Sequence, residues 1–256
     1  MENSINRAQY GQRKFFFSLG AKKKNLGYLA ALILMVFGLA GCEKQSLGLT
    51  NTTYYAVIQL EGETTMVVPK GSSYVEPGFT ATMAGEDVSN QVAVSGTVDE
   101  TTSGVYAITY SIKNKDGFTS SVTRTVVVLD VTDPIEGFWA ADASCYRDYG
   151  GTKTAFGAPF EILIIAEGEG KYYVDDILAG WYSQRAGYGA TYAMQANITV
   201  ASDGTITLDD SYIPGWGDGL DYLSGGSFNA ATKQISYQVG YAGIMDFYIT
   251  LNKVDL

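Results

Sequence analysis

The sequence of 256 residues has room for one or two domains. It is 46% hydrophobic, with 30 glycines, 19 tyrosines and 5 prolines, which excludes a disordered chain, a collagen and a coiled coil and favours a strand-rich globular protein. The absence of histidine excludes a Ser-His-Asp triad, a Cys-His pair and every histidine-ligated zinc or copper site. Two cysteines, Cys42 and Cys145, are too few for a disulfide framework or a four-cysteine zinc site.

The N-terminal segment has the charge order of an export signal. Six of the 17 basic residues precede an apolar run, Leu26–Ala40. As a helix this run would be about 22 Å long, shorter than the roughly 30 Å hydrocarbon core of a membrane, which favours a cleaved signal over a permanent transmembrane helix. The run ends in Leu39-Ala40-Gly41-Cys42. This tetrapeptide resembles the lipobox of bacterial lipoproteins, in which the cysteine thiol receives a diacylglycerol and becomes the mature N-terminus; the alternative is an ordinary signal peptide with a chance cysteine.

We therefore expect a signal peptide over residues 1–41, lipidation at Cys42 and a polar linker over residues 42–53. Two or three acyl chains, at about 0.8 kcal/mol per buried methylene, would anchor the protein to a membrane. Glu43 follows the cysteine where an aspartate would favour inner-membrane retention in the best-known sorting system, so the resemblance implies an outer-membrane lipoprotein, which we expect to be exposed at the cell surface.

The mature chain is strongly acidic. The leader holds six basic residues and one acidic residue, so the 11 basic and 26 acidic residues that remain give a net charge of about −15. Such a surface repels nucleic acid and anionic membranes, so we expect no nucleic-acid partner. Solubility of an envelope protein is a simpler explanation of the same charge.

Residues 54–131 contain short β-branched runs separated by turn residues, a spacing typical of an all-β sandwich. The predicted strands are Ala56–Leu60, Thr65–Val68, Phe79–Met83, Val92–Val94, Val105–Ile112 and Val122–Leu129. In the fifth strand large and small side chains alternate, as in a strand buried on one face. The Asp116-Gly117 pair that follows supplies the positive φ of a tight hairpin.

One stretch of this region is similar to a known module. Gly71–Phe79, followed by Gly85–Val88, Gly104–Tyr106 and Asp116-Gly117, resembles the bacterial Ig-like domains that are common in surface lipoproteins and multidomain glycosidases. Such modules act as spacers or stalks, so the resemblance implies no chemistry in this half. The antibody-type Cys-Trp-Cys core is missing.

Residues 132–256 form a second unit, separated from the first by the polar link Asp130–Pro134. It holds all three tryptophans and twelve tyrosines, against five tyrosines in the first domain. Apolar alternation and turn signals predict two hairpins and two further strands: Phe160–Ala166 with Lys171–Asp175, Tyr192–Val200 with Thr205–Leu208, and strands around Gln234–Val239 and Phe247–Asn252. No window has the apolar spacing of a long amphipathic helix, so we expect about eight antiparallel strands that close into a barrel or stack as a second sandwich.

The start of this unit, Gly137-Phe138-Trp139, resembles the Gly-x-Trp that begins the first strand of lipocalin-like barrels, where the tryptophan plugs the closed end. The basic residue that packs on that tryptophan in lipocalins has no evident counterpart, because only Lys233 and Lys253 follow the last arginine, Arg185. As a whole the organisation resembles Bacteroides-type surface lipoproteins of unknown function. Some relatives by organisation, the SusE- and SusF-like proteins, hold starch or other glycans at the cell surface.

Two aromatic loops supply the candidate ligand-binding residues. The first loop is Asp209–Tyr222, in which a proline and three alternate glycines preclude a regular strand. The second is Trp181–Gly189, which contains aromatic residues and the guanidinium of Arg185. The candidates are Trp216, Asp218, Asp221, Tyr222, Trp181, Tyr182, Arg185 and Tyr188. An exposed indole can stack on the apolar face of a sugar while carboxylates accept its hydroxyl protons.

The two predicted strands between these loops form an even count, which brings both loops to one rim of a barrel. We therefore expect Trp181 and Trp216 to be partly exposed and close enough to share a ligand. The alternatives are that Trp216 folds back and caps the barrel as a core residue, and that Arg185 pairs with a surface carboxylate.

Two acid pairs, Asp175-Asp176 and Asp209-Asp210, invite a glycosidase or a calcium interpretation. Neighbouring residues in a strand point to opposite faces, so adjacent acids rarely form one site, and the sequence has no Asp-x-Asp-x-Asp-Gly calcium loop. Cys145 has no adjacent base and is expected to be a small buried side chain.

The sequence thus predicts an all-β, non-enzymatic, lipid-anchored cell-surface protein, with no catalytic residues, no cofactor and no metal. It would bind glycan or another small ligand through the aromatic loops of the C-terminal domain, and its partners would be the membrane and outer-membrane glycan-uptake proteins. The alternative is a structural or adhesion lipoprotein that contacts a protein partner. A carboxylate-based hydrolase is a weaker third hypothesis.

Overall fold

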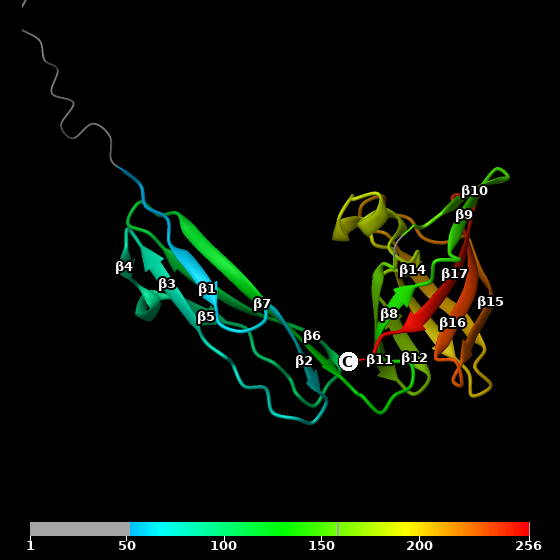
Figure 1. The fold of residues 1–256 in the computed structure, drawn as a ribbon, viewed down its shortest axis with the longest axis horizontal. Helices are drawn as coiled ribbons and strands as arrows, with labels where there is room; N and C mark the ends of the chain where they lie inside the picture. Colours follow the sequence, from blue (N-terminus) through cyan, green and yellow to red (C-terminus); the bar gives the residue numbers. More distant parts are fainter. Residues whose placement is uncertain (1–51, 158, 256) are drawn as a thin grey trace, which may run out of the picture. The chain divides into compact units, whose positions relative to one another are not determined.

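The computed structural model describes residues 52–157 and 159–255, so Cys42 and the predicted signal peptide lie outside the described residues. Within these ranges the protein is all-β, as predicted, with seventeen strands in three sheets and only short helical turns (Figure 1). None of the helices in these two ranges is long and apolar enough to cross a membrane.

The N-terminal half has two sheets, as expected for a sandwich. The first contains β1 (Val57–Leu60), β3 (Phe79–Met83) and β4 (Glu86–Asp87). The second has the order β2 (Thr65–Pro69), β7 (Thr119–Leu129), β6 (Gly104–Lys113) and β5 (Ala93–Ser95). β2 runs parallel to β7, and the other pairs in these sheets are antiparallel. All six predicted strands are present; the sequence pattern missed only the two-residue β4.

The core of this half follows the predicted alternation. On β6, Ile108, Tyr110 and Ile112 are buried, and the residues between them are more exposed. The turn from β6 to β7 is closed by the side chain of Asn114, which accepts hydrogen bonds from two backbone N–H groups. Gly117 in the same turn has φ of +92°, the positive value that the Asp-Gly pair predicted.

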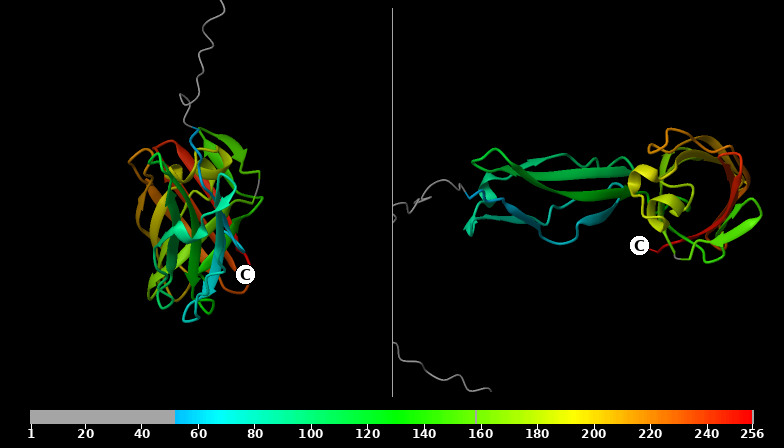
Figure 2. Two further views of the ribbon diagram at one scale, coloured as in Figure 1. Left: turned by 90° about the vertical axis from the view of Figure 1, so that its left-hand side faces the viewer. Right: turned by 90° about the horizontal axis from the view of Figure 1, so that it is seen from above.

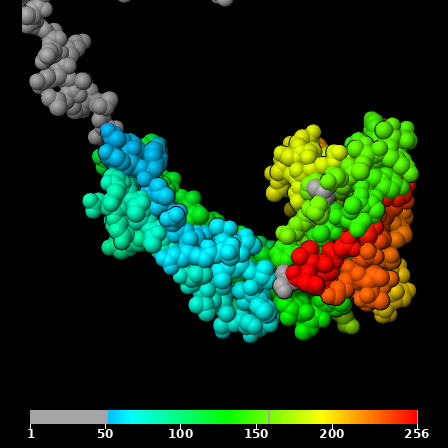
Figure 3. Space-filling view, in the orientation of Figure 1, coloured from blue at the N-terminus to red at the C-terminus, as the bar shows by residue number. Residues whose placement is uncertain are grey.

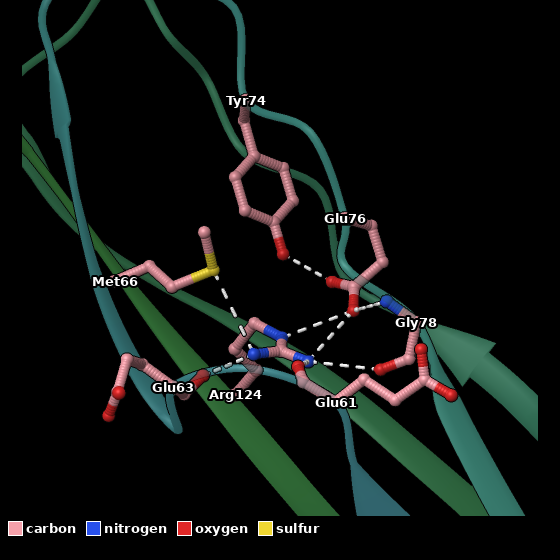
Figure 4. Close-up of polar contacts among 7 residues, drawn as sticks. All are labelled: Glu61, Glu63, Met66, Tyr74, Glu76, Gly78 and Arg124. Carbon is pink, nitrogen blue, oxygen red and sulfur yellow. Dashed lines mark hydrogen bonds and ion pairs between the residues drawn. The ribbon is translucent and has the colours of Figure 1, made fainter.

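A buried guanidinium explains the segment that carries the Ig-like resemblance. Arg124 of β7 is fully buried, and its Nη2 lies 3.0 Å from a carboxylate oxygen of Glu76 (Figure 4). The hydroxyl of Tyr74 donates to the other oxygen of Glu76. Arg124 also donates to the backbone carbonyls of Glu61, Glu63 and Gly78. Tyr74, Glu76 and Gly78 of the segment 71–79 therefore help to satisfy a buried charge, which stabilises this half of the chain.

The C-terminal half is one ten-stranded antiparallel sheet that curls around a core (Figure 2, right). Its strands are β8 (Gly137–Ala141), β9 (Tyr146–Tyr149), β10 (Thr152–Ala155), β11 (Glu161–Gly168), β12 (Lys171–Val174), β13 (Gln195–Val200), β14 (Ile206–Tyr212), β15 (Tyr222–Asn229), β16 (Gln234–Tyr241) and β17 (Met245–Lys253). The pairing order is β14, β13, β12, β11, β8, β17, β16, β15, and the β9–β10 hairpin extends from β17. The outer strands β14 and β15 meet at one isolated bridge between Thr205 and Ser227. The continuous curled sheet corresponds to the barrel alternative and not to a second sandwich.

The interior of the curled sheet contains the residues that alternation predicted. Ile235, Tyr237 and Val239 on β16 are buried, and so are Phe247, Ile249 and Leu251 on β17. The two predicted hairpins are present as β11–β12 and β13–β14. The sequence pattern missed the β9–β10 hairpin and β15, and it began the loop after β14 too early, because the strand continues to Tyr212.

Trp139 at the start of the curled sheet does have a cationic partner. Its indole is fully buried, and its Nε1 donates to the carbonyl of Ile135 at 2.8 Å. Lys253 lies opposite Trp139 in the β8–β17 register, with its Nζ 5.7 Å from the ring centroid. The expectation that no basic residue would pack on this tryptophan was therefore wrong: the pairing of the first and last strands of the domain supplies it.

Candidate functional site

Three connections gather aromatic side chains at one rim of the curled sheet. They join β12 to β13, β14 to β15 and β16 to β17, and successive connections of this parity lie at the same end of an antiparallel meander. The β12–β13 connection, in yellow, forms a protruding lobe of the domain (Figure 3). We call the aromatic residues gathered here the rim cluster; they are Tyr182, Tyr188, Tyr192, Trp216 and Tyr241.

Trp216 is the centre of the rim cluster. Its ring lies perpendicular to that of Tyr182 at a centroid distance of 4.7 Å, and 5.0 Å from the ring of Tyr192. Tyr241 stacks on it at 6.2 Å with an interplanar angle of 25°. Despite these contacts Trp216 keeps 44% of its surface exposed, and Tyr188 keeps 56%. Trp216 is therefore not the buried cap of the barrel that the alternative proposed.

The β12–β13 and β14–β15 loops approach each other closely because a backbone hydrogen bond joins them and glycines leave room for the neighbouring rings. The backbone N–H of Gly215 donates to the carbonyl of Thr191 at 2.8 Å and so joins the β14–β15 loop to the β12–β13 loop. The ring of Tyr192 lies directly on Gly215, where a side chain would collide with it. Gly180, with φ of +80°, turns the chain into a five-residue π-helix that carries Tyr182 toward Trp216.

Trp181 lies inside the domain, contrary to the expectation that it is partly exposed. It is 3% exposed and packs against Phe156 at 4.9 Å and Phe247 at 5.7 Å. The π-helix turns adjacent residues in different directions, so Trp181 faces the core while Tyr182 faces Trp216. Trp181 therefore supports the rim cluster from below and is not placed to touch a ligand.

Two guanidinium groups cover Trp181. The Cζ atom of Arg185 lies 4.2 Å from its ring centroid, and that of Arg147, on β9, lies 4.7 Å from it. Within residues 52–157 and 159–255, neither arginine has a carboxylate oxygen within 4.0 Å, so the predicted alternative of a surface ion pair for Arg185 is not found there. Arg147 was missed at the sequence level because the short β9 strand was not predicted.

The acidic candidates of the second loop take part in its internal hydrogen bonds. Asp218 accepts from the hydroxyl of Tyr241 at 3.0 Å, and burial together with this carboxylate raises the pKa of Tyr241. Asp221 accepts from the backbone N–H of Gly243 at 2.7 Å. The first bond ties the β14–β15 loop to the end of β16 and the second ties it to the β16–β17 connection, so the two carboxylates hold the rim cluster in place.

Tyr222 is separate from the rim cluster. It lies on β15 with its ring across Gly240, and 40% of its surface is exposed. Its hydroxyl donates to Asp246 and accepts from Gln238 Nε2 at 3.0 Å. Of the eight candidate residues, the structure thus brings Trp216, Tyr182 and Tyr188 into one group, in which Trp216 and Tyr188 are exposed and Tyr182 is partly buried; the others support this group or lie beside it.

The first acid pair does not form a two-carboxylate site. Asp176 is buried and accepts from the backbone N–H groups of Leu178 and Met194 and from the Ser183 hydroxyl at 2.5 Å. Burial raises its pKa to about 6. Asp175 accepts from the backbone of β11, and burial raises its pKa to about 7. Asp176 therefore anchors both ends of the loop that carries Tyr182.

The second acid pair departs from the expected alternation. A register shift in the β13–β14 ladder pairs Asn197 with Asp210 and the next residue with Leu208, which leaves Asp209 as an extra residue in a bulge. Both carboxylates consequently reach the same face: Asp210 accepts from Asn197 Nδ2, and Asp209 accepts from the hydroxyl of Thr199. The expectation of opposite faces fails here because a bulge interrupts the period of two.

Cys145 is a core residue, as predicted. It is buried, its Sγ donates to the carbonyl of Thr250 at 3.2 Å, and burial raises the pKa of the thiol. In the described part of the chain, no group of three or more Asp, Glu, Cys or His side chains is arranged to hold a metal ion.

Comparisons with known proteins place both halves of the chain. Residues 58–128 match the family model of the bacterial surface protein Ig-like domain, and residues 129–253 match the model of a C-terminal domain family. The crystal structure of the lipoprotein BT2262 from Bacteroides thetaiotaomicron is similar over 78% of this chain and 100% of that one, with 38% identity and a TM-score of 0.69. No curated protein matches the chain.

Two further structures show weaker likeness. One contains CBM51-2 in complex with GlcNAc and the INT domains of Clostridium perfringens ZmpB; it covers 46% of this chain and 31% of that one, with 19% identity and a TM-score of 0.25. The other contains the M60 catalytic domain with CBM51-1 and CBM51-2 of the same protein; it covers 48% of this chain and 14% of that one, with 17% identity and a TM-score of 0.26.

Proposed function

Because the chain belongs to the family of the Bacteroides thetaiotaomicron lipoprotein BT2262, we propose that it is a non-enzymatic, lipid-anchored surface protein that binds glycan through the rim cluster. The Ig-like surface domain that precedes the curled sheet supports a spacer that carries the binding domain away from the membrane. The lipid would be attached to Cys42, after cleavage of residues 1–41.

The observation that carries the proposal is that Trp216 is exposed and yet held in place by neighbouring aromatic rings. An indole that is 44% exposed and fixed on several sides by aromatic rings offers a preorganised apolar surface. Such a surface loses little conformational entropy when a sugar ring stacks on it. The exposed ring of Tyr188, 6.3 Å from Trp216, would extend the contact to a neighbouring sugar.

A glycan array with the mature protein tests this function. We expect binding to a restricted set of oligosaccharides, with at least about a fivefold weaker affinity for the Trp216→Ala variant, because stacking on an aromatic ring contributes on the order of 1 kcal/mol. Phe118→Ala is the matched control, because Phe118 is also an exposed aromatic residue, 51% exposed, but lies in the turn of the Ig-like half. Equal affinity of all three proteins would contradict the proposal.

A structural or adhesion role is the second candidate, because exposed aromatic side chains are not confined to the rim cluster. Tyr149 on β9 is 47% exposed and Tyr212 at the end of β14 is 51% exposed. Aromatic residues are enriched in protein interfaces as well as in sugar sites. An array without any bound glycan would favour this second candidate.

The anchor is tested independently of the ligand. Metabolic labelling with a fatty-acid analogue should label the wild-type protein and not Cys42→Ala, which should be released from membranes or fail to mature. An unlabelled wild-type protein would contradict lipidation. Protease treatment of intact cells then tests whether the protein faces outward from the outer membrane, as we propose.

A further inference from the structure

In the part of the chain that the structure describes, two arginines beside the rim cluster have no carboxylate within ion-pair distance, although the chain is rich in acidic residues. Residues 42–256 contain 26 acidic and 11 basic residues. Arg124, in the Ig-like half, is paired with Glu76, whereas Arg147 and Arg185 have no carboxylate oxygen within 4.0 Å in the described ranges. Both guanidinium groups lie over the same indole, that of Trp181, so the two positive charges belong to one region of the domain.

The guanidinium of Arg185 is held in a fixed orientation with its end free. Its Nε donates to the carbonyl of Phe156 at 3.0 Å, and its Cζ lies over the ring of Trp181. Neither Nη group makes a hydrogen bond to another described residue, and the side chain is exposed. A guanidinium fixed at Nε with two free Nη groups is a preorganised donor pair for a carboxylate.

Arg147 shares a contact with Tyr182 of the rim cluster. Its Nη1 and the hydroxyl of Tyr182 both contact the sulfur of Met245, at 4.0 and 3.3 Å. Its Nε is buried and has no hydrogen-bond partner in the described part of the chain. Tyr182 therefore has Trp216 on one side and the guanidinium of Arg147 near its hydroxyl.

We propose that Arg185 and Arg147 form a cationic subsite for a sugar carboxylate, so that the glycan bound by the rim cluster is an acidic one, such as a uronate-containing oligosaccharide. This inference rests on the proposed function. The carboxylate would accept charge-assisted hydrogen bonds from the Nη groups of Arg185, and the positive charge of Arg147 over the same indole would add to the attraction, while a neighbouring sugar stacks on Trp216. Asp218 and Asp221 lie on the other loop, where their carboxylates would repel that of the sugar and so disfavour the reverse orientation of the oligosaccharide.

The test compares matched acidic and neutral probes by isothermal titration calorimetry. The probes are oligogalacturonide and its methyl ester, oligomers of alginate and hyaluronan, sialyllactose, lactose, and hexaglutamate as a non-sugar polyanion. For at least one acidic sugar we expect an affinity about tenfold or more above that of its neutral counterpart and of hexaglutamate, since hydrogen bonds to charged groups contribute on this scale. This preference should weaken as salt is added.

Three variants locate the effect. Arg185→Gln and Arg147→Gln should each reduce binding of the acidic probe about tenfold and leave the weaker binding of the neutral probe unchanged. Arg185→Lys should bind the acidic probe with intermediate affinity, because lysine retains the positive charge but lacks the planar guanidinium that donates two parallel hydrogen bonds. Lys171→Gln is the control: it removes an exposed positive charge at the β11–β12 hairpin, at the opposite rim. Thermal unfolding monitored for each variant identifies a protein that has merely lost its fold.

The outcomes separate the two proposals. Equal binding of acidic and neutral sugars, or full acidic binding by folded Arg185→Gln and Arg147→Gln, overturns the cationic subsite and leaves glycan binding intact. Hexaglutamate bound as tightly as the acidic sugar overturns it in favour of an acidic protein partner. Failure to bind any sugar overturns the proposed function together with the subsite. An acidic preference that Trp216→Ala leaves unchanged supports the subsite alone.

Discussion

Tyr192 and Gly215 are in direct contact: the tyrosine ring lies on the backbone of the glycine, and a Cβ atom at position 215 would overlap with that ring. The backbone conformation of Gly215 is open to other residues, so the absence of a side chain matters here for space alone. This contact, with the hydrogen bond from Gly215 N to Thr191, sets how closely the two aromatic loops approach.

Gly215→Ala should therefore displace Tyr192 and loosen Trp216 while the fold is retained. We expect a several-fold loss of glycan affinity and a cost of about 1–2 kcal/mol in the free energy of unfolding, as for overpacking of a closely packed site. Titration calorimetry and urea unfolding measure the two effects. Gly168→Ala is the control, because a Cβ there meets no atom within 4 Å and φ is not positive. Equal affinity of both variants and wild type would show that the contact does not shape the site.

Lys253 should stabilise the curled sheet through Trp139. Its Nζ lies near the indole face and donates to the carbonyls of Asp133 and Pro134 at 3.1 and 2.7 Å. Lys253→Met keeps the aliphatic stem and removes these interactions, so the free energy of unfolding should fall by about 2 kcal/mol. Lys233→Met, which removes an exposed ion pair with Asp255, should cost less than about 0.5 kcal/mol. Thermal unfolding compares the two, and similar melting temperatures would contradict the role given to Lys253.

Arg124→Met should destabilise the Ig-like half strongly. The change leaves Glu76 without its counter-ion and removes one donor from each of three backbone carbonyls. Removing one member of a buried ion pair costs about 3–5 kcal/mol, and the lower end applies because Glu76 is partly exposed. Circular dichroism during urea unfolding should show an earlier transition than in Lys115→Met, whose side chain is exposed. Coincident transitions would show that the buried ion pair contributes little.

The loop that carries Tyr182 should become less stable as the pH rises above 4. Burial raises the pKa of Asp176 from 3.8 to about 6, so between these values the folded protein binds the proton more tightly than the unfolded chain. The free energy of unfolding therefore falls as pH rises through this window, by about 2–3 kcal/mol from this group, and then levels off. Asp175, with a pKa raised to about 7, should extend the decline.

Asp176→Asn isolates this effect, because an amide keeps an acceptor for the backbone N–H groups and does not ionise. The difference in the free energy of unfolding between wild type and variant should change between pH 4 and 6 and be constant above pH 7. Urea unfolding at several pH values measures it, with Asp116→Asn, exposed in the Ig-like turn, as the control. A constant difference throughout would mean that Asp176 titrates normally.

The strands were predictable because their apolar alternation is local. The pattern around Ile235 and Phe247 fixes which side of each strand is buried, and the turn at Asp116-Gly117 fixes a connection. The convergence of the loops that carry Tyr182 and Trp216 followed from the parity of the strands between them. These features require no knowledge of distant contacts.

The sequence predicts residue positions wrongly where these depend on the pairing of distant strands or on an irregular backbone. Local composition does not show which of two adjacent aromatic residues turns inward. The expectation that Trp181 is partly exposed is wrong because a π-helix directs it into the core. Lys253 finds Trp139 only through the pairing of the first and last strands. The bulge at Asp209 and the short strand that carries Arg147 have no periodic signal of their own.

Protection of Trp216 from a soluble quencher tests the proposed binding site most directly. Trp139 and Trp181 are buried, so acrylamide should quench mainly the fluorescence of Trp216. A saturating oligosaccharide selected on the array should reduce this quenching in wild type and have no effect in Trp216→Phe. Undiminished quenching of Trp216 with the sugar bound would place the ligand elsewhere and contradict a stacking role for the rim cluster.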